Sequence, residues 1–258
     1  MRAVWTGSLS FGLVNIPVRL YGAAEERALN FRLLDKHDLS PISYQKVSGT
    51  KKEVGQKDIV RGYEVNGGYV VLTDEDFKSA DARKTETIEI MQFSDSGDIL
   101  PEYYDKPYYI EPQKKAAKAY ALLRDALEKS GRVAIARFVL RDKEHIGAIS
   151  TDGRILILEQ LRYMDEIRNP RMLDVPEKTG YSDHEMQMAI ALIDSQTRAF
   201  DARDFKDTYA MQLRRLIVEK ARGKKPKRIT ERPVEATDVS EILEMLKKSL
   251  EKTPAHSK

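Results

Sequence analysis

The sequence predicts a β-rich α+β fold, and three patterns along the 258-residue chain support this prediction. Short apolar runs separated by turn signals fill the first hundred residues, and strand signals return at 133–158. A helical period appears at 114–130 and again in two stripes between 182 and 217. Strands that precede a run of helices are typical of the α+β class. We therefore predict a β-rich body at 1–170, a helical segment at 171–222 and an appendage at 223–258.

The first hundred residues contain two strand signals and one helix signal. A strand is predicted at 14–20, where four aliphatic residues alternate with other side chains: Val14, Ile16, Val18 and Leu20. Pro17 has no N–H group to donate, so we expect this strand at a sheet edge or with a bulge. Thr73 and Asp76 have the spacing of an N-cap pair and predict a short helix around Phe77. Alternation resumes at 87–93 and predicts another strand.

The turn-rich segment between these strands carries the first of two basic clusters. The net charge is only +3, from 44 basic and 41 acidic residues, so the distribution of charge matters more than its sum. Between 46 and 61 five residues are basic and two are acidic, the basic ones being Lys46, Lys51, Lys52, Lys57 and Arg61. The second cluster has no acid and consists of Arg222, Lys224, Lys225, Lys227 and Arg228. The two clusters predict a local polyanion site, although a solvated loop also explains the first one.

The middle of the chain predicts a helix followed by three strands. Apolar residues recur at three and four positions through 114–130, and Ser130-Gly131 ends the pattern. Strand signals follow at 133–140, 146–150 and 154–158. Asp152-Gly153 joins the last two with a sequence that suits a tight hairpin turn. We expect a small antiparallel sheet or barrel here.

Two amphipathic helices are predicted after Asn169-Pro170. Ser182 and Glu185 form a capping box at the start of the first helix. Its apolar stripe comprises Met186, Ala189, Ile190, Ile193, Thr197 and Phe200. The second stripe comprises Phe205, Tyr209, Leu213, Leu216 and Ile217. These stripes can pack on the β-rich body or form an arm that reaches a second subunit.

The appendage reads as a basic linker with two prolines and one short helix. Asp238 can cap this helix, and its apolar face comprises Val239, Ile242, Leu243, Leu246 and Leu250. A helix of this length is marginally stable alone in water, so it needs a surface to pack on. The sequence favours a peptide that docks on a partner protein, with folding back onto its own domain as the alternative.

The sequence offers no catalytic, metal or cofactor signature. It lacks a phosphate-binding loop, a nucleophile elbow and a paired-histidine motif. The acids Asp74, Glu75 and Asp76 could hold Mg²⁺, but acids in a first helical turn are also favoured by the helix dipole. His145 and His184 have no partner at a diagnostic spacing. We expect no catalytic residue, no metal and no cofactor.

The composition also predicts the compartment. With no cysteine, the chain can form neither disulfides nor thiolate zinc sites, which fits a reducing cytoplasm. No run of about 18 apolar residues is present, so we expect no membrane partner. Gly7, Gly12 and Pro17 interrupt the N-terminal segment, which therefore lacks the apolar core of a signal peptide.

Seven blocks of sequence resemble bacterial Ku, the DNA-end-binding protein of non-homologous end joining. The first block, WTGSLSFGLVNIPVRLY at 5–21, is quite specific by itself. The others follow in family order at 71–77, 108–112, 120–123, 132–138, 165–168 and 205–209. Together they cover roughly residues 1–222.

The resemblance implies a β-barrel core with an inserted bridge hairpin and a helical arm, two copies of which form a ring. The bridge would lie at about 42–68, and arms of about 12 residues would reach on the order of 40 Å at about 3.3 Å per residue. Its basic residues would contact DNA phosphates without reading bases. Some family members carry a Cys-x-x-Cys pair in this insertion, which is absent here, so no zinc role carries over.

The resemblance also implies partners. The arm would dimerise two copies of the chain through Ile190, Ile193, Phe200, Tyr209 and Leu213, although core packing within one subunit explains the same pattern. The basic cluster at 222–228 would hold DNA from outside the ring. Val239, Ile242, Leu243 and Leu246 would recruit and stimulate the ATP-dependent ligase D in the repair of double-strand breaks. A nucleoid-associated location in the cytoplasm would follow.

Two rival functions remain open at this stage. A general double-stranded DNA-binding, chromatin-like protein would use the same basic clusters without a closed ring, and it would bind circular and linear DNA alike. A nuclease or phosphotransferase built around 74–76 would need Mg²⁺, and it would lose turnover but keep binding when those acids become alanine.

Overall fold

The computed structural model describes residues 1–25, 27, 29–50, 52–80, 86–141, 143–176 and 180–223. The chain divides into two compact units, Met1–Pro170 and Arg171–Lys258, and each is described by itself. The first unit contains a barrel, together with an insertion between two of its strands. The second contains the helical arm.

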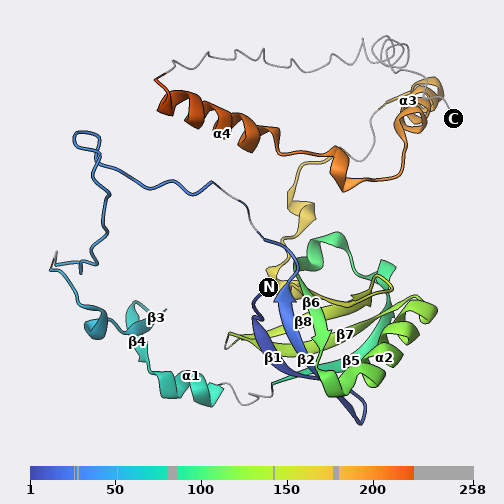
Figure 1. The fold of residues 1–258 in the computed structure, drawn as a ribbon, viewed down its shortest axis with the longest axis horizontal. Helices are drawn as coiled ribbons and strands as arrows, with labels where there is room; N and C mark the ends of the chain where they lie inside the picture. Colours follow the sequence, from blue (N-terminus) through green and yellow to red (C-terminus); the bar gives the residue numbers. More distant parts are fainter. Residues whose placement is uncertain are drawn as a thin grey trace. The chain divides into compact units, whose positions relative to one another are not determined.

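The barrel is closed by the strands in the order β1-β2-β6-β9-β8-β7-β5 (Figure 1). Neighbouring strands are antiparallel except β1 and β5, which are parallel and pair Ser8 with Thr87. The parallel joint is possible because the insertion after β2 carries the chain across to β5. The strands are β1 Trp5–Phe11, β2 Val14–Gly22, β5 Thr87–Asp95, β6 Tyr104–Pro112, β7 Arg132–Leu140, β8 Lys143–Thr151 and β9 Leu156–Leu161.

One hydrophobic cluster fills the barrel, because alternate residues of its strands point inward. Phe138 of β7 and Ile149 of β8 are 1% and 0% exposed, and Leu158 of β9 is 0% exposed. Gly147 lies opposite Ala136 in this layer, and a β-carbon built there would come within 2.7 Å of a Leu158 methyl carbon. The glycine therefore lets neighbouring side chains approach the β8 backbone.

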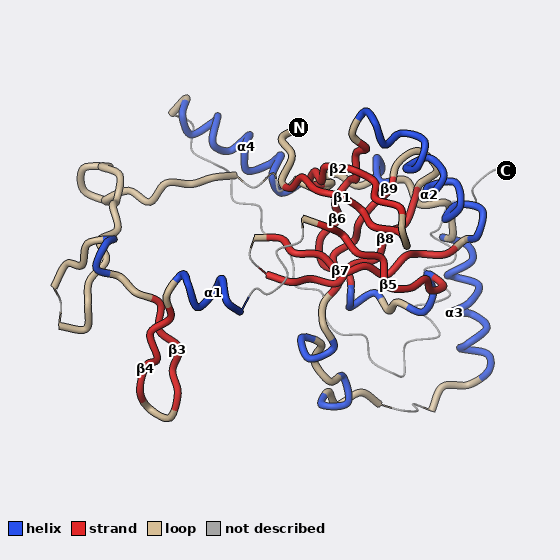
Figure 2. Tube along the Cα trace, turned by 90° about the horizontal axis from the view of Figure 1, so that it is seen from below, coloured by secondary structure: helices blue, strands red, loops and turns tan. Residues whose placement is uncertain are grey.

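Helix α2, Ala117–Ser130, closes part of this core. Tyr120, Leu123 and Leu127 belong to the barrel cluster, and Figure 2 shows the helix beside the red strands. The helix ends as predicted at Gly131, whose φ of 65° is the left-handed conformation that glycine adopts without strain. The predicted strands at 87–93, 133–140, 146–150 and 154–158 all form, with ends that differ from the prediction by up to three residues. They do not make a separate sheet, since they share one barrel with β1 and β2.

Pro17 differs from the expectation of an edge strand. β2 pairs with β1 on one side and with β6 on the other, and its β1 register runs through Ser8 and Pro17 without a bulge. The β2–β6 register ends at Val18, and the Pro17 carbonyl accepts a hydrogen bond from the Gln113 N–H at 2.8 Å. In an antiparallel strand the N and O of one residue point to the same side. The missing N–H of Pro17 therefore faces the end of the ladder, where no donor is needed.

The insertion between β2 and β5 contains its own small elements. The hairpin of β3 Arg61–Val65 and β4 Gly68–Leu72 turns at Asn66 and Gly67, whose φ angles of 50° and 81° suit a hairpin turn. Helix α1, Asp74–Ala80, follows. Its predicted N-cap is confirmed, because Thr73 Oγ1 accepts from the Asp76 N–H at 3.2 Å and the Asp76 carboxylate accepts from the Thr73 N–H at 2.8 Å.

The hairpin of the insertion is shorter and later in the chain than the resemblance implied. Its paired strands have five residues each, rather than arms of about 12 residues across 42–68. Within 42–60 the described pairing is one isolated bridge, Val47 with Glu53, followed by a 3₁₀ turn at Gln56–Asp58. Eight of the thirteen residues at 46–58 are Gly, Lys, Glu or Asp, which are depleted in strands, so a long ladder has little support here.

The arm contains α3, Asp183–Gln196, and α4, Thr208–Ala221. The predicted capping box is present, with the Glu185 N–H donating to Ser182 Oγ at 3.3 Å and Glu185 Oε2 accepting from the Ser182 N–H at 2.6 Å. Elsewhere in the chain, outside α3 and α4, further 3₁₀ turns lie at Ser96–Asp98, Pro101–Tyr103, Lys114–Ala116, Met164–Glu166, Pro170–Met172 and Ala202–Asp204.

The helical stripes are shorter than predicted. The chain leaves the helix after Gln196, so Thr197 and Phe200 do not extend the α3 stripe, and Phe205 precedes α4. Phe200 and Phe205 instead stack in the connection, with ring centroids 5.5 Å apart. The β-branched Thr197 lowers helix propensity at this end. No helix in the described part of the chain is long and apolar enough to cross a bilayer.

Candidate nucleic-acid interface

The predicted basic cluster lies on a small loop of the insertion. The loop is closed by the Val54 N–H, which donates to the Lys46 carbonyl at 2.9 Å, and by the Ser48 N–H, which donates to the Lys52 carbonyl at 2.9 Å. Lys46 Nζ donates to Gln56 Oε1 at 2.6 Å. These contacts use mostly main-chain groups, so the loop has a defined shape while its lysine side chains remain exposed.

Lys52 of this loop and Lys57 of the 3₁₀ turn that follows it are free cations. Both residues are exposed, and neither ammonium group has an ion pair or hydrogen-bond partner within the described ranges. Phosphate oxygens are suited to such groups, because an exposed ammonium loses little by exchanging water for an anion. Lys51 lies outside the described residues.

Arg61 is held by contacts within the insertion. Its guanidinium lies 3.6 Å from Asp74 and 4.7 Å from the centroid of the Phe77 ring, so β3 is joined to α1 by an ion pair and a cation–π contact. The side chain is still 69% exposed and keeps donors that a phosphate could accept. The predicted DNA contact of Arg61 therefore remains a prediction, and the structure adds an internal role.

The acids at 74–76 have structural contacts rather than the arrangement of a metal centre. Asp74 pairs with Arg61, and the Asp76 carboxylate accepts from the backbone and hydroxyl of Thr73, which lowers the pKa of Asp76. Within the described ranges, no group of three or more histidines and acids could hold a metal ion. The geometry thus gives no support to a Mg²⁺-dependent enzyme.

The predicted dimerisation residues are all solvent-accessible in the single chain. Ile190, Ile193 and Tyr209 are 49%, 64% and 73% exposed, Phe200 is 80% exposed, and Leu213 is half-buried. No residue of the described part of the arm is buried. The described part of the arm thus forms no buried core of its own, and the dimerisation role of these residues remains a prediction.

The insertion, like the arm, leaves its apolar side chains accessible to solvent. No described residue between 23 and 80 is buried, and large apolar side chains are exposed along its whole length. Examples are Phe31, Tyr44 and Tyr63, at 66%, 83% and 68% exposure. Two separate segments of the chain thus present apolar surface and cations together.

Comparison with known proteins decides the family. A sequence model described as the Ku70/Ku80 beta-barrel domain matches residues 10–188, well over half of the chain. A protein of Opitutus terrae named non-homologous end joining protein Ku is 39% identical over 100% of this chain and 94% of its own length. The chain belongs to the Ku family. Proteins of the same name from Bacillus subtilis and Archaeoglobus fulgidus are 36% and 38% identical, over 98% and 97% of this chain and 83% and 99% of their own lengths.

Membership of the Ku family confirms three expectations. The predicted resemblance is correct, the closed barrel is the one the family implies, and the chain is a Ku protein rather than an enzyme. The block at 5–21 that resembles Ku forms β1 and nearly all of β2, which are neighbouring strands of the barrel.

Several predicted site residues cannot be placed. Lys224, Lys225, Lys227 and Arg228 lie outside the described residues, as do Val239, Ile242, Leu243 and Leu246. Arg222 is exposed directly after α4, where its N–H donates to the carbonyls of Val218 and Glu219 at 3.2 and 3.1 Å.

Sequence reasoning also missed two arginines of the barrel. Arg124 of α2 and Arg154 of the β8–β9 turn line a common pocket. Neither lies in a basic cluster, and the only signal near them was Asp152-Gly153, which we interpreted as a turn. Charge counting along a sequence cannot find cations that meet only after folding.

Proposed function

We propose that this Ku-family protein binds the ends of double-stranded DNA as a homodimer that encircles the duplex, without reading sequence, in the repair of double-strand breaks by non-homologous end joining. The observation that carries the proposal is the combination of a barrel that has its own core with an insertion and an arm in whose described parts no residue is buried. Family membership supplies the link to end joining.

A second copy of the chain is the natural cover for the exposed apolar segments. A two-stranded hairpin such as β3–β4 is marginally stable alone, and its Tyr63 and Val70 pair on one face at 68% and 52% exposure. The arm likewise exposes Ile193 and Phe200. Burying both segments between twofold-related copies would favour a closed assembly that does not open easily.

End specificity then comes from topology. A closed ring loads only where a duplex terminates, and it can slide inward because contacts to phosphates fix no register. Lys52 and Lys57 would supply such contacts from the loop at 46–54 and the turn that follows it, as would Lys46, Lys51 and Arg61 nearby. Residues 222–228 would add contacts outside the ring. Location at the nucleoid would follow from this binding.

The decisive experiment compares a linear duplex with a covalently closed circle of the same sequence and length at matched salt. The linear complex is then circularised with an added ligase and challenged with high salt. We expect preferential binding to linear DNA and protein trapped on the circularised product. Equal binding to both forms with complete release by salt would replace the ring with a general double-stranded DNA binder.

The role of the loop lysines is tested by salt titration. Replacing Lys52 and Lys57 with alanine should make the slope of log K against log salt shallower by up to about two units, since each lost phosphate contact contributes about 0.9. Lys118→Ala with Lys129→Ala, two exposed lysines of α2, is the matched control and should leave the slope unchanged. An unchanged slope in the loop variant would remove Lys52 and Lys57 from the contact.

We further propose that the segment after Gly223 recruits and stimulates ligase D, the ATP-dependent ligase implied by the resemblance. Support comes from the sequence, where an apolar helical face follows a basic linker at 224–236. A chain truncated after Gly223 should keep its preference for linear DNA and lose stimulation of the ligase. Stimulation by the truncated chain would place the ligase contact elsewhere.

A further inference from the structure

An open pocket of about 700 Å³ on the barrel has no place in the proposed function. Its lining residues come from α2, the end of β6 and the turn between β8 and β9. Its walls combine apolar and charged side chains. The lining residues that matter below are Tyr109, Ala121, Arg124, Asp152, Arg154 and Ile155.

The back of the pocket is rigid because Tyr120 is fixed at both hydrogen-bonding positions. Its hydroxyl donates to the Ile110 carbonyl at 2.8 Å and accepts from the Leu156 N–H at 2.7 Å, which ties α2 to β6 and to β9. Tyr120 is only 5% exposed. The pocket is therefore a built feature of the barrel rather than a gap between loops.

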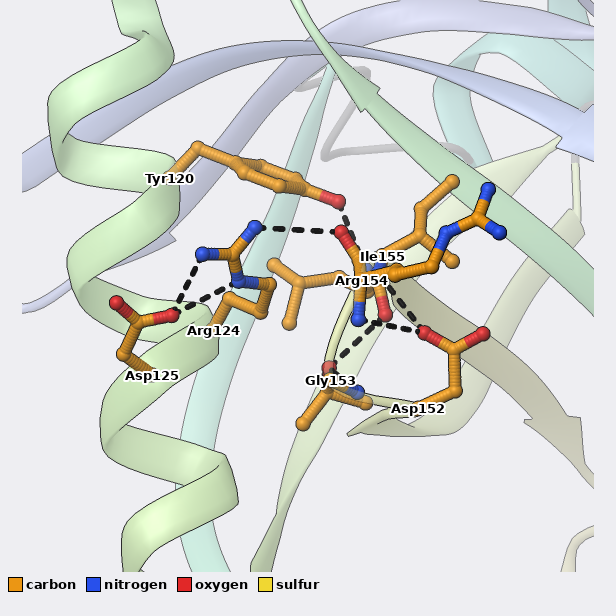
Figure 3. A network of polar contacts seen from close by, with 9 residues as sticks. Tyr120, Arg124, Asp125, Asp152, Gly153, Arg154 and Ile155 are labelled. Carbon is orange, nitrogen blue, oxygen red and sulfur yellow. Dashed lines mark hydrogen bonds and ion pairs between the residues drawn. The ribbon is translucent and has the colours of Figure 1, made fainter.

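The turn that forms the opposite wall is also fixed. The Asp152 carboxylate accepts from the N–H groups of Arg154 and Ile155, both at 2.9 Å, and these bonds lower the pKa of Asp152. Thr151 Oγ1 donates to the Ile155 carbonyl at 3.0 Å. The Asp152 carboxylate thus stabilises the turn through its bonds to the backbone, which Figure 3 shows.

Arg124 connects the two walls and keeps spare donors. Its Nε and Nη2 reach Asp125 Oδ1 at 2.8 and 2.7 Å, and its Nη1 donates to the Arg154 carbonyl at 3.3 Å (Figure 3). A guanidinium has five N–H donors, so about two remain for another acceptor. The plane of the group is already oriented, which reduces the entropy lost when a carboxylate binds.

The acids that line the pocket, Glu111 and Asp152, accept hydrogen bonds from other groups, whereas the Arg154 guanidinium keeps its donors. Glu111 accepts from the Tyr21 hydroxyl at 2.7 Å and lies 3.6 Å from Arg19, and Asp125 is paired with Arg124. The guanidinium of Arg154 is exposed and has no hydrogen bond or ion pair to any described residue. Arg154, together with the spare donors of Arg124, therefore supplies the N–H groups of the pocket that remain open to an acceptor.

We propose that this pocket is a docking site for an acidic, partly apolar segment of a partner protein. A carboxylate of the segment would pair with Arg154 and take the spare donors of Arg124, in the fork geometry that favours carboxylates. A neighbouring apolar side chain would contact Tyr109, Ala121 and Ile155, which are half-buried. A peptide fits better than a duplex, since a phosphate backbone offers nothing to an apolar wall.

The test uses a phage library of random 12-residue peptides selected on the full chain and counter-selected on Arg154→Glu. We expect enriched peptides that combine Asp or Glu with large apolar residues, and Arg154→Glu should weaken a synthetic copy of them about 10- to 100-fold. Lys129→Glu, at the far end of α2, is the charge-matched control and should bind like the unmodified chain.

A second variant separates the apolar wall from the charge. Ala121→Trp fills the pocket without changing its charge and should also abolish peptide binding, whereas Arg154→Lys should retain part of it. All variants should bind linear DNA normally, because none of the changed residues belongs to the proposed DNA contacts. The proposal is overturned if the selection yields no binder, if the enriched peptides are neutral or basic, or if binding survives both Arg154→Glu and Ala121→Trp.

Discussion

The barrel and the two segments attached to it use similar side chains for opposite purposes. Phe138 of β7 is 1% exposed and lies in the barrel core, whereas Phe200 of the arm is 80% exposed and stacks on Phe205. The insertion repeats the pattern of the arm with Tyr44 and Tyr63. Contiguous apolar surface of this kind marks an interaction site in soluble proteins. The comparison teaches that the barrel has a core of its own, whereas the described parts of the insertion and the arm leave their large apolar side chains accessible.

Polar contacts separate the regions in the same way. In the barrel, Tyr120 joins residues 10 and 36 positions away, and Arg162 reaches Asp105 across 57 positions. Between Ser182 and Ala221 in the arm, the side-chain hydrogen bonds join residues at most four positions apart, and the ion pair of Arg198 with Asp204 spans six. Long-range contacts make the barrel cooperative, and local contacts leave the arm helices dependent on their own caps and on whatever they bind.

The largest contrast is expected when a phenylalanine is replaced by alanine in the barrel and in the arm. Phe138→Ala should lower the free energy of unfolding by about 3–5 kcal/mol, because it leaves a cavity in a closed core. Phe200→Ala should change the unfolding of the barrel by less than about 0.5 kcal/mol and instead weaken the homodimer. Denaturant titration and sedimentation over a range of protein concentrations distinguish the two. Equal loss of unfolding free energy in both variants would contradict the view that only Phe138 belongs to a core.

Tyr120→Phe tests whether the polar contacts of the barrel matter as much as its packing. The change leaves the Ile110 carbonyl and the Leu156 N–H without their partner, which should cost about 1–3 kcal/mol of unfolding free energy. Tyr181→Phe, at a side chain 60% exposed in the arm, should stay within about 0.5 kcal/mol. A neutral Tyr120→Phe variant would mean that water replaces the hydroxyl.

Ser182→Ala sharpens the view that the arm depends on local signals. It removes the acceptor for the Glu185 N–H at the start of α3 and should reduce the stability of that helix by about 0.5–2 kcal/mol. Hydrogen exchange of the first-turn amides measures the loss, while barrel amides should exchange as before. Ser195→Ala, near the other end of α3, is the control. Faster exchange in the barrel would show that the two regions are coupled.

The smallest effect is expected from His145 at one end of the barrel. Burial, aided by Lys143, lowers the pKa of His145 below its ordinary value of 6.5. A hydrogen bond with the Leu140 backbone and the charges of Glu166 and Asp105 only partly oppose this. As pH falls through 6.5, the unfolded chain takes up a proton that the folded chain resists, so stability decreases until the pH drops below the folded pKa. Denaturant titration between pH 8 and pH 5 should show this loss.

His145→Gln should remove that part of the pH dependence. The control His184→Gln changes an exposed histidine of α3 and should leave the pH profile of the barrel as it was. An identical profile in the unmodified chain and His145→Gln would show that the histidine makes no contribution.

Much of the local structure could be predicted from sequence, because its causes are local. The alternation at 14–20 gave β2, and Gly131 ended α2 where the helical period stopped. The pairs Thr73–Asp76 and Ser182–Glu185 cap helices through bonds that span three residues. The basic loop at 46–61 was also visible, since its charges are close in sequence.

The errors have causes that lie outside the local sequence. Phe200 continued the apolar period of the predicted helix, but α3 ends at Gln196. Beyond the helix, Phe200 stacks on Phe205. Pro17 predicted an edge strand, yet β2 is paired on both sides. The proline is tolerated because the ladder between β2 and β6 ends at Val18, so no N–H group is needed at position 17. In both cases a partner remote from the pattern decided the outcome.

The sequence by itself determined the elements, the Ku resemblance and the basic loop, because alternation, caps and clustered charges act over a few residues. Only the tertiary structure decided that β1 and β5 join in parallel to close one barrel, and that Arg61 pairs with Asp74. It alone brought Arg124 and Arg154 to one pocket. The physical reason is that strand pairing and side-chain contacts between distant residues depend on the closure of the whole barrel, which no local pattern encodes.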